Sequence, residues 1–152
     1  MLVQTQVTIQ APRDKVWAVM TDMAQLASIL GGVEKIEVLE KPADPSKGLA
    51  GLKWRETRIL FGKPASADKW ITEAVDGEFY KTQAEDGGFV FVSTMTLSDA
   101  SGGVALTSVH DSLPQTLSAR VMAIPMSLFF KGVARKALMQ DLNDIKAAAE
   151  KP

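Results

Sequence analysis

The sequence contains no cysteine, a single histidine and a single tyrosine among its 152 residues. Without cysteine, disulfide bonds, cysteine nucleophiles and zinc sites with thiolate ligands are excluded. The single histidine also argues against a transition-metal site, because imidazole and thiolate side chains are the usual ligands of those metals. We therefore expect neither a bound metal nor a cofactor, and the lack of cysteine suits a reducing cytoplasm.

An excess of charge of one sign and a long apolar run are also missing. The formal net charge is -1, whereas a nucleic-acid-binding surface needs a concentration of basic residues. No run of about 18 apolar residues occurs, so we expect no membrane-spanning helix. The start, MLVQTQVTIQ, has neither the basic region nor the apolar core of a secretory signal. The composition is typical of one soluble globular domain over residues 1–152.

The apolar spacing changes from a two-residue to a helical repeat at Pro12. Before Pro12, alternating apolar and polar residues predict a half-buried strand over Leu2–Gln10. Proline suits the first turn of a helix, and the apolar residues after it have helical spacing. A second short helix is expected over Ala24–Leu30 and should end at the two glycines that follow. These two short helices would turn the chain and leave a groove at their corner.

Six further strands are expected between these helices and residue 113. Every break between them contains glycine, and most breaks also contain aspartate, as hairpin turns favour. Short connections of this kind indicate an antiparallel meander, so the complete sheet would have about seven strands. The expected strands are Val33–Glu40, Leu52–Phe61, Ala65–Val75, Phe79–Ala84, Phe89–Ser98 and Val104–Leu113.

The segment after Pro114 is rich in strong helix formers, namely Ala, Leu, Met, Lys and Arg. Pro125 should kink or divide this helix, because proline removes one backbone hydrogen bond and crowds the preceding turn. From Met126 onward the apolar residues form one stripe. Asp141 falls near this stripe and would either bond to a nearby backbone or side-chain donor or, as we prefer, simply lie at the edge of the stripe. A helix of about 24 residues would be roughly 36 Å long, enough to cross a sheet. A curved sheet bends away from such a rod, so we expect a cavity between them.

Three parts of the sequence carry a resemblance to a known superfamily. The opening, VTIQAPRDKVWAVMTDMAQLASILGGVEKIEVLE, combines a strand, an APxxxVW motif, an aspartate and the strand IEVLE. ITEAVDGE resembles the strand and turn VTEVDPP of that superfamily, and ALMQDLNDIKAAAEK is similar to its closing helix with a DLxxxK pattern. Over nearly its whole length the chain resembles the START-like, or SRPBCC, superfamily of polyketide cyclase/dehydrase-like proteins.

The resemblance implies an α+β helix-grip fold. In this fold a curved seven-stranded antiparallel sheet surrounds a long C-terminal helix, and two short helices follow the first strand. It also implies a carrier or binding protein that holds a small hydrophobic ligand, such as a lipid, polyketide or quinone, between the sheet and that helix. Two alternatives stay open, because fold does not fix function. They are a polyketide cyclase/dehydratase-type enzyme that uses the same cavity and a co-chaperone-like protein-interaction domain.

Side-chain alternation along the strands gives candidate cavity residues. In Phe89–Ser98 the bulkier apolar set is expected inside, and in Val104–Leu113 the superfamily pattern implies the set that contains the histidine. In Leu52–Phe61 the alternation does not decide which face lines the cavity. The candidate ligand-binding residues on the strands are Trp54, Glu56, Arg58, Trp70, Phe89, Phe91, Met95, Leu106, Ser108 and His110.

Glu56, Arg58 and His110 are the candidates for chemistry. Glu56 and Arg58 are two residues apart, so they share one face of their strand. On the inner face they would form a charged pair able to orient a ligand carbonyl or hydroxyl, at a high cost of burial unless they are paired. The alternative is a solvated surface pair. An inward His110 would be a polar anchor or a general acid/base near neutral pH, and the alternative is a histidine without a chemical role.

Large apolar side chains supply the remaining candidates. Trp54 and Trp70 would either stack on a ligand or pack in the core or at its rim. Around Pro125 the chain is rich in methionine and phenylalanine, and methionine adapts its shape to apolar ligands. This segment is expected either to form a movable lip of the pocket or to belong to the core. Its candidate ligand-binding residues are Met122, Met126, Phe129, Phe130 and Val133.

Overall fold

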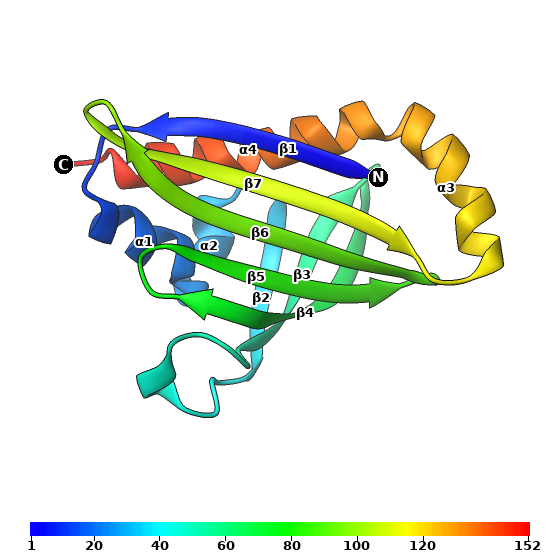
Figure 1. The fold of residues 1–152 in the computed structure, drawn as a ribbon, viewed down its shortest axis with the longest axis horizontal. Helices are drawn as coiled ribbons and strands as arrows, with labels where there is room; N and C mark the ends of the chain where they lie inside the picture. The colour runs from blue at the N-terminus through cyan, green and yellow to red at the C-terminus, as the bar shows by residue number, and fades with distance from the viewer.

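The computed structural model describes residues 1–152 and has the predicted helix-grip architecture, a curved antiparallel sheet with a long C-terminal helix against it (Figure 1). Two short helices follow the first strand and cover one end of the sheet. The fold prediction is therefore confirmed. The elements are β1 (Leu2–Ile9), α1 (Arg13–Thr21), α2 (Met23–Ile29), β2 (Val33–Glu40), β3 (Lys53–Leu60), β4 (Lys63–Val75), β5 (Phe79–Asp86), β6 (Phe89–Ala100), β7 (Gly103–Pro114), α3 (Leu117–Phe129) and α4 (Lys131–Ala149), with a short 3-10 turn at Pro45–Lys47.

The sheet has seven strands in the order β1-β7-β6-β5-β4-β3-β2. Every neighbouring pair is antiparallel, so β2 to β7 form the predicted meander and β1 adds to its far edge. The four strands from β4 to β7 are longer than the sequence predicted. In the β6–β7 hairpin, for example, pairing continues to Ala100 and Gly103, past the polar residues that end the apolar alternation.

The core lies where α1, α2 and α4 meet the concave side of the sheet. Val16 and Met20 of α1 are fully buried, and Leu26 of α2 packs in the same cluster. α4 contributes a stripe that includes Leu142 and Ile145, spaced three residues apart as on one face of a helix. The helices thus close one end of the sheet, which leaves the space toward the other end less filled.

The C-terminal segment forms two helices that meet at an angle of 70° (Figure 1). The sequence predicted a kink or a division at Pro125. The structure has no division there, because Pro125 lies inside α3 and the break between the helices is at Phe130. Pro125 has no N–H that could donate to the Val121 carbonyl. Because Val121 lies on an exposed part of α3, water can satisfy this carbonyl instead. The predicted helix of about 24 residues is likewise too long, since α4 has 19. Taken singly, none of the helices is long and apolar enough to cross a membrane; only the bent α3–α4 pair meets that criterion of length and composition.

Candidate functional site

A pocket of about 420 Å³ lies between the concave face of the sheet and α4. Of its 23 lining residues 14 are hydrophobic, so its walls are mainly apolar. α1 and α2 close one end with Met20, Met23 and Leu26, and α4 contributes Ala134 and Leu138 from the opposite side. This volume falls within the range of roughly 300–1,000 Å³ that small-molecule sites occupy.

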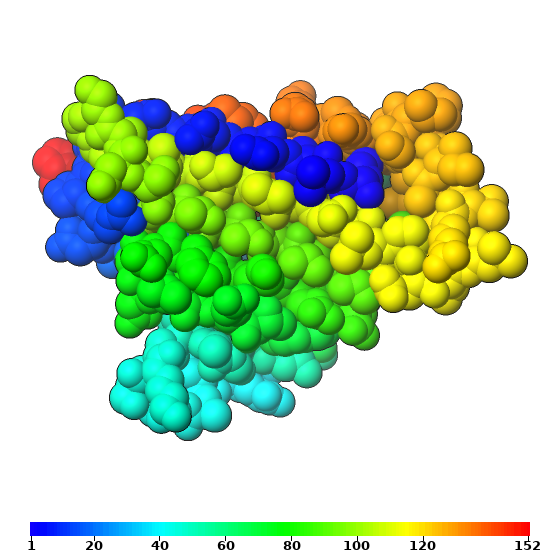
Figure 2. Space-filling view, viewed as in Figure 1, coloured from blue at the N-terminus to red at the C-terminus, as the bar shows by residue number.

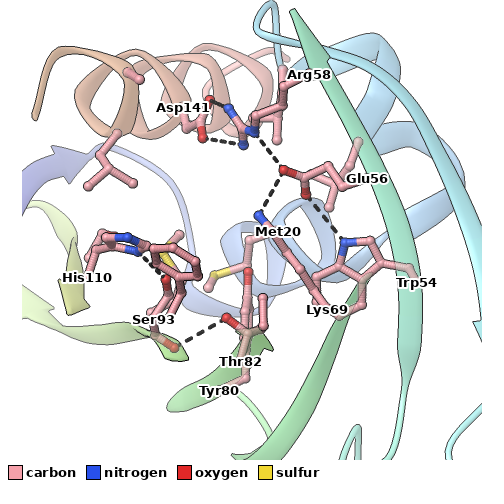
Figure 3. Close-up of a pocket in the computed structure, with 18 of the residues that line it drawn as sticks. Met20, Trp54, Glu56, Arg58, Lys69, Tyr80, Thr82, Ser93, His110 and Asp141 are labelled. Atoms are coloured by element: carbon pink, nitrogen blue, oxygen red, sulfur yellow. Dashed lines mark hydrogen bonds and ion pairs between the residues drawn. The ribbon is translucent and has the colours of Figure 1, made fainter. Parts of the chain in front are cut away.

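One wall of the pocket carries four charged side chains joined in a row (Figure 3). The Glu56 carboxylate accepts hydrogen bonds from Lys69 Nζ at 2.9 Å and from Arg58 Nε at 2.6 Å. Its second oxygen accepts from Trp54 Nε1 at 3.3 Å. Arg58 in turn donates to both carboxylate oxygens of Asp141, at 3.2 and 2.7 Å. We call Lys69, Glu56, Arg58 and Asp141 the charged row; its two positive and two negative charges cancel.

The backbone register explains how three of these side chains come together. Trp54, Glu56 and Arg58 alternate along β3, so all three face the pocket. Lys69 of β4 lies directly opposite Trp54 in the antiparallel pairing and therefore shares the inner face. The sequence left the inner face of this strand open, and the structure places the set with Trp54 inside. Glu56 is buried, so the solvated surface pair that the sequence also allowed does not form.

The charged row stabilises the ionised forms of Glu56 and Arg58. Burial alone would raise the pKa of Glu56, but Lys69 and Arg58 outweigh it and lower this pKa from 4.5 to about 2. Burial would lower the pKa of Arg58, but Asp141 and Glu56 outweigh it and raise the pKa above its ordinary value. At neutral pH Glu56 and Arg58 are therefore both ionised, and the Glu56 carboxylate holds no proton that it could transfer.

A second polar group lies on another side of the pocket (Figure 3). His110 Nδ1 is 2.7 Å from Ser93 Oγ, and these two residues are directly paired across β6 and β7. The Phe91 ring stacks on the imidazole with a centroid distance of 6.0 Å and an interplanar angle of 18°. Burial, and then the charge of Lys69, lower the pKa of His110 below its ordinary 6.5, so the imidazole is neutral at pH 7.

Tyr80 of β5 lies between these two polar groups in the sheet order and also lines the pocket. Its ring packs edge-on against Trp17 at a centroid distance of 6.0 Å. Burial, together with the charges of Glu56 and Asp141, raises the pKa of Tyr80, which keeps its hydroxyl protonated at neutral pH. A protonated phenol can donate a hydrogen bond into the pocket.

The structure divides the predicted ligand-binding residues into two groups. Those in the pocket lining are Trp54, Glu56, Arg58, Phe91, Met95, Ser108 and His110. Those outside the lining are Trp70, Phe89, Leu106, Met122, Met126, Phe129, Phe130 and Val133. Trp70 points to the convex face, where the Lys53 ammonium lies over its ring at 6.0 Å from the ring centroid. Phe89 and Leu106 are buried by the packing of the sheet. The other five candidates lie on α3, at the bend and in the first turn of α4, away from the pocket.

Lys69, Tyr80 and Asp141 are pocket residues that the sequence interpretation missed. Asp141 binds Arg58 of β3, so the alternative of a bond to a side-chain donor holds, and the preferred position at the edge of the α4 stripe was wrong. In β4 the large apolar Trp70 suggested the wrong face, since the inner positions there include the charged Lys69. Alternation in β5 could have identified Tyr80, because Tyr80, Thr82 and Ala84 are all buried on one face.

A comparison of sequences identifies the family of the chain. Residues 2–150 match the family described as "Polyketide cyclase / dehydrase and lipid transport". The chain belongs to this family. The match covers nearly every residue of this chain. It therefore includes the opening and closing segments and confirms the resemblance that they carry. A search of curated proteins finds no match to the sequence.

Solved structures of other proteins share the fold of this family member at low sequence identity. A START superfamily protein from Mycobacterium smegmatis is 14% identical with a TM-score of 0.75, over 98% of this chain and 97% of that chain. The Zhui aromatase/cyclase from Streptomyces sp. R1128 is 18% identical with a TM-score of 0.73, over 99% and 93%. The protein TTHA0849 from Thermus thermophilus is 15% identical with a TM-score of 0.79, over 98% and 97%. These similarities establish the helix-grip fold and not an activity.

Proposed function

We propose that this protein binds a small hydrophobic molecule in the pocket between the sheet and α4 and acts as a carrier or binding protein. The observation that carries the proposal is the pocket of about 420 Å³ with mainly apolar walls and a few convergent polar groups. Membership of a family described by lipid transport as well as cyclisation supports the same conclusion. We expect this role in the cytoplasm.

The polar groups of the pocket indicate the chemistry of the ligand. The four charges of the row neutralise one another, so the pocket does not require a charged ligand. Lys69 has three N–H donors and uses one on Glu56, and the protonated Tyr80 hydroxyl is a further donor. An uncharged, mostly apolar molecule with a carbonyl or hydroxyl oxygen, such as a quinone, a polyketide or a neutral lipid, would satisfy these donors.

Native mass spectrometry of protein purified from cells, followed by organic extraction, tests for a bound ligand. A fluorescent apolar dye measures the free pocket independently. Ala134→Trp would fill the pocket from α4 and should abolish dye binding, whereas Ala147→Trp, exposed on the same helix, should not. A protein that carries no ligand and binds no dye, or equal dye binding by both variants, would contradict the proposal.

A polyketide cyclase/dehydratase-type enzyme is the second candidate, and the His110–Ser93 contact favours it. A neutral imidazole beside an apolar chamber can accept a proton from a ligand carbon or hydroxyl, and the pocket shape would hold a reactive chain near it. In an enzyme of this kind His110→Ala should abolish turnover of a candidate polyketide while dye binding persists. Unchanged turnover in that variant would remove His110 from the reaction.

The co-chaperone-like alternative receives less support. A domain of that kind would have a sealed interior and an exposed apolar patch. The interior of this protein is not sealed, because it contains the pocket. An exposed apolar surface is present on α3, outside the pocket, and it leads to a separate inference.

A further inference from the structure

α3 presents its most apolar face to solvent. Leu117, Val121, Ile124 and Leu128 follow the spacing of one helical face, and each is between 63% and 80% exposed. Ala119, on the opposite side of the helix, is the one buried residue of α3. An amphipathic helix in a globular protein normally turns its apolar stripe to the core, so α3 has the reverse orientation.

The neighbouring β3–β4 hairpin extends this apolar surface. Phe61 at its tip is 78% exposed and packs edge-on against Phe130, at the bend between α3 and α4, with a centroid distance of 6.1 Å. Phe61 is also the only non-glycine residue with a positive φ, 51°, a conformation that is costly for a bulky side chain. Phe129, beside the bend, is exposed as well. Figures 1 and 2 show α3 projecting at the end of the molecule opposite the C-terminus.

The charges on α3, at the bend and at the hairpin tip are all positive, whereas the acidic residues Glu85 and Asp86 lie beside the β5–β6 turn that packs against the N-terminal end of α3. Residues 113–140 contain Arg120, Lys131, Arg135 and Lys136 but no aspartate or glutamate, although the whole chain has a net charge of -1. Arg120 lies on α3 and Lys131 directly follows the bend, and both are exposed. The hairpin adds Lys63, again without an acidic neighbour between Ile59 and Ser66. An apolar stripe on a segment whose own charges are all basic is the pattern of a helix that lies in a lipid–water interface.

We propose that α3, the bend at Phe130 and the tip of the β3–β4 hairpin dock on an anionic lipid bilayer. Positive charge complements the negative surface of such a membrane and adds to the burial of the apolar stripe. α3 has 13 residues, whereas a helix needs about 20 to span the hydrocarbon core, so α3 lies along the surface. A second copy of the chain fits less well, because a two-fold contact through this surface would bring its positive charges together.

The docking surface adjoins the pocket. Leu60, next to Phe61, and Ala134, one turn after Phe130, are both pocket-lining residues. A protein docked in this way would bring this part of the pocket lining close to the lipid. The docking itself depends only on the outer surface, and it does not require the proposed ligand-binding function.

Vesicle flotation with the purified protein tests the docking. We expect the protein to float with vesicles of phosphatidylcholine and phosphatidylglycerol at 7:3, and to stay at the bottom with phosphatidylcholine alone. Binding should fall as salt rises from about 0.1 M to 1 M, because the screening length drops from about 10 Å to about 3 Å. No flotation with either vesicle, or equal flotation with both, would overturn the proposal.

Paired variants locate the surface. Val121→Glu with Leu128→Glu should weaken binding at least tenfold, since both side chains belong to the α3 stripe. Val38→Glu with Val75→Glu adds the same charge at exposed apolar positions outside α3 and the bend, so it should have a much smaller effect. Arg120→Glu with Lys131→Glu should weaken binding by about fivefold or more for each charge, whereas Lys41→Glu with Lys47→Glu should change it far less. Equal losses in the matched pairs would overturn the assignment to α3.

Sedimentation of the same variants separates the membrane from other occupants. A wild-type protein that stays monomeric and binds only anionic vesicles supports the proposal. A dimer that Val121→Glu with Leu128→Glu dissociates, with no vesicle binding, would assign the surface to a second copy and overturn it. Because dye binding in the pocket is a separate measurement, failure of the docking and failure of the ligand-binding function are distinguishable.

Discussion

Arg58 of β3 and Asp141 of α4 are 83 residues apart in the chain and are joined by two hydrogen bonds across the pocket. α4 packs mainly against β1, at the opposite edge of the sheet from β2 and β3. The Arg58–Asp141 pair therefore ties the helix to the far half of the sheet. Because Arg58 also binds Glu56, the tie continues through the charged row to Lys69.

Removal of the Asp141 carboxylate should loosen this tie. Breaking a fully buried ion pair typically costs about 3–5 kcal/mol. Asp141 and Arg58 are 15% and 23% exposed and Arg58 keeps Glu56, so we expect Asp141→Ala to lower the free energy of unfolding by about 2 kcal/mol. Glu150→Ala, which removes a surface pair with Lys146 on the same helix, should change little. Urea unfolding monitored by tryptophan fluorescence measures both; an equal effect in the two variants would contradict the role of Asp141.

Neutralising Glu56 should destabilise the protein more. Glu56→Gln leaves the Lys69 and Arg58 charges close together on the pocket wall without the anion that separates them. We expect a loss of about 3 kcal/mol at pH 7, because the removed charge is only 7% exposed.

Asp68→Asn is the matched control for Glu56. Asp68 binds Arg55 through two hydrogen bonds on the convex face of the same strand pair. Since that pair faces solvent, its loss should leave the unfolding midpoint nearly unchanged. A midpoint for Glu56→Gln as close to wild type as that of Asp68→Asn would show that the charged row adds nothing to stability.

The lowered pKa of Glu56 predicts how the stability of the protein depends on pH. The pKa of Glu56 is lowered from 4.5 to about 2 in the folded protein, so below pH 4.5 the unfolded chain takes up a proton first. Its stabilising contribution is present above pH 4.5 and is lost as pH falls toward 2. The difference is worth roughly 3 kcal/mol. Urea unfolding of wild type and Glu56→Gln from pH 6 to pH 2.5 should give curves that converge at low pH; a constant gap would assign the acid sensitivity to other groups.

The fold was predictable because its signals are local. Alternation in β1, glycine-containing turns between the strands and the change to helical spacing at Pro12 each act within a few residues. The position of the helix break was not predictable, since Pro125 carries the stronger local signal. At the actual break, Phe130 meets the distant Phe61.

The candidate site was predictable only in part, for a physical reason. Alternation identified Phe91 and Met95 because bulky apolar side chains follow the inner face of a strand, whereas Ser108 came from the resemblance to the superfamily. The charged row depends on pairing between distant segments, and Asp141 looks like a surface residue until Arg58 is placed opposite it. A charge on an inner face contradicts the apolar rule that assigns faces, and Lys69 was missed for this reason.

The only histidine of the chain gives a direct measurement inside the pocket. Burial, and then the positive charge of Lys69, lower the pKa of His110 below 6.5. The imidazole of His110 should therefore titrate at a pH below 6.5 in the folded protein. Because no other histidine exists, its Cε1 proton gives one unambiguous NMR signal whose shift can be followed from pH 8 to pH 4.5.

Lys69→Met should raise this midpoint, since it removes the second cause of the lowered pKa and leaves burial in place. Lys53→Met is the control, because the Lys53 ammonium lies over Trp70 on the convex face of the same strand pair. The control should leave the midpoint where it is in wild type. A midpoint at or above 6.5 in wild type would contradict this account of His110, because it would show an imidazole that is solvated or paired with an anion. Only a midpoint well above 7 would leave His110 largely protonated near neutral pH, and His110 could not then serve as the neutral base that the enzyme alternative requires.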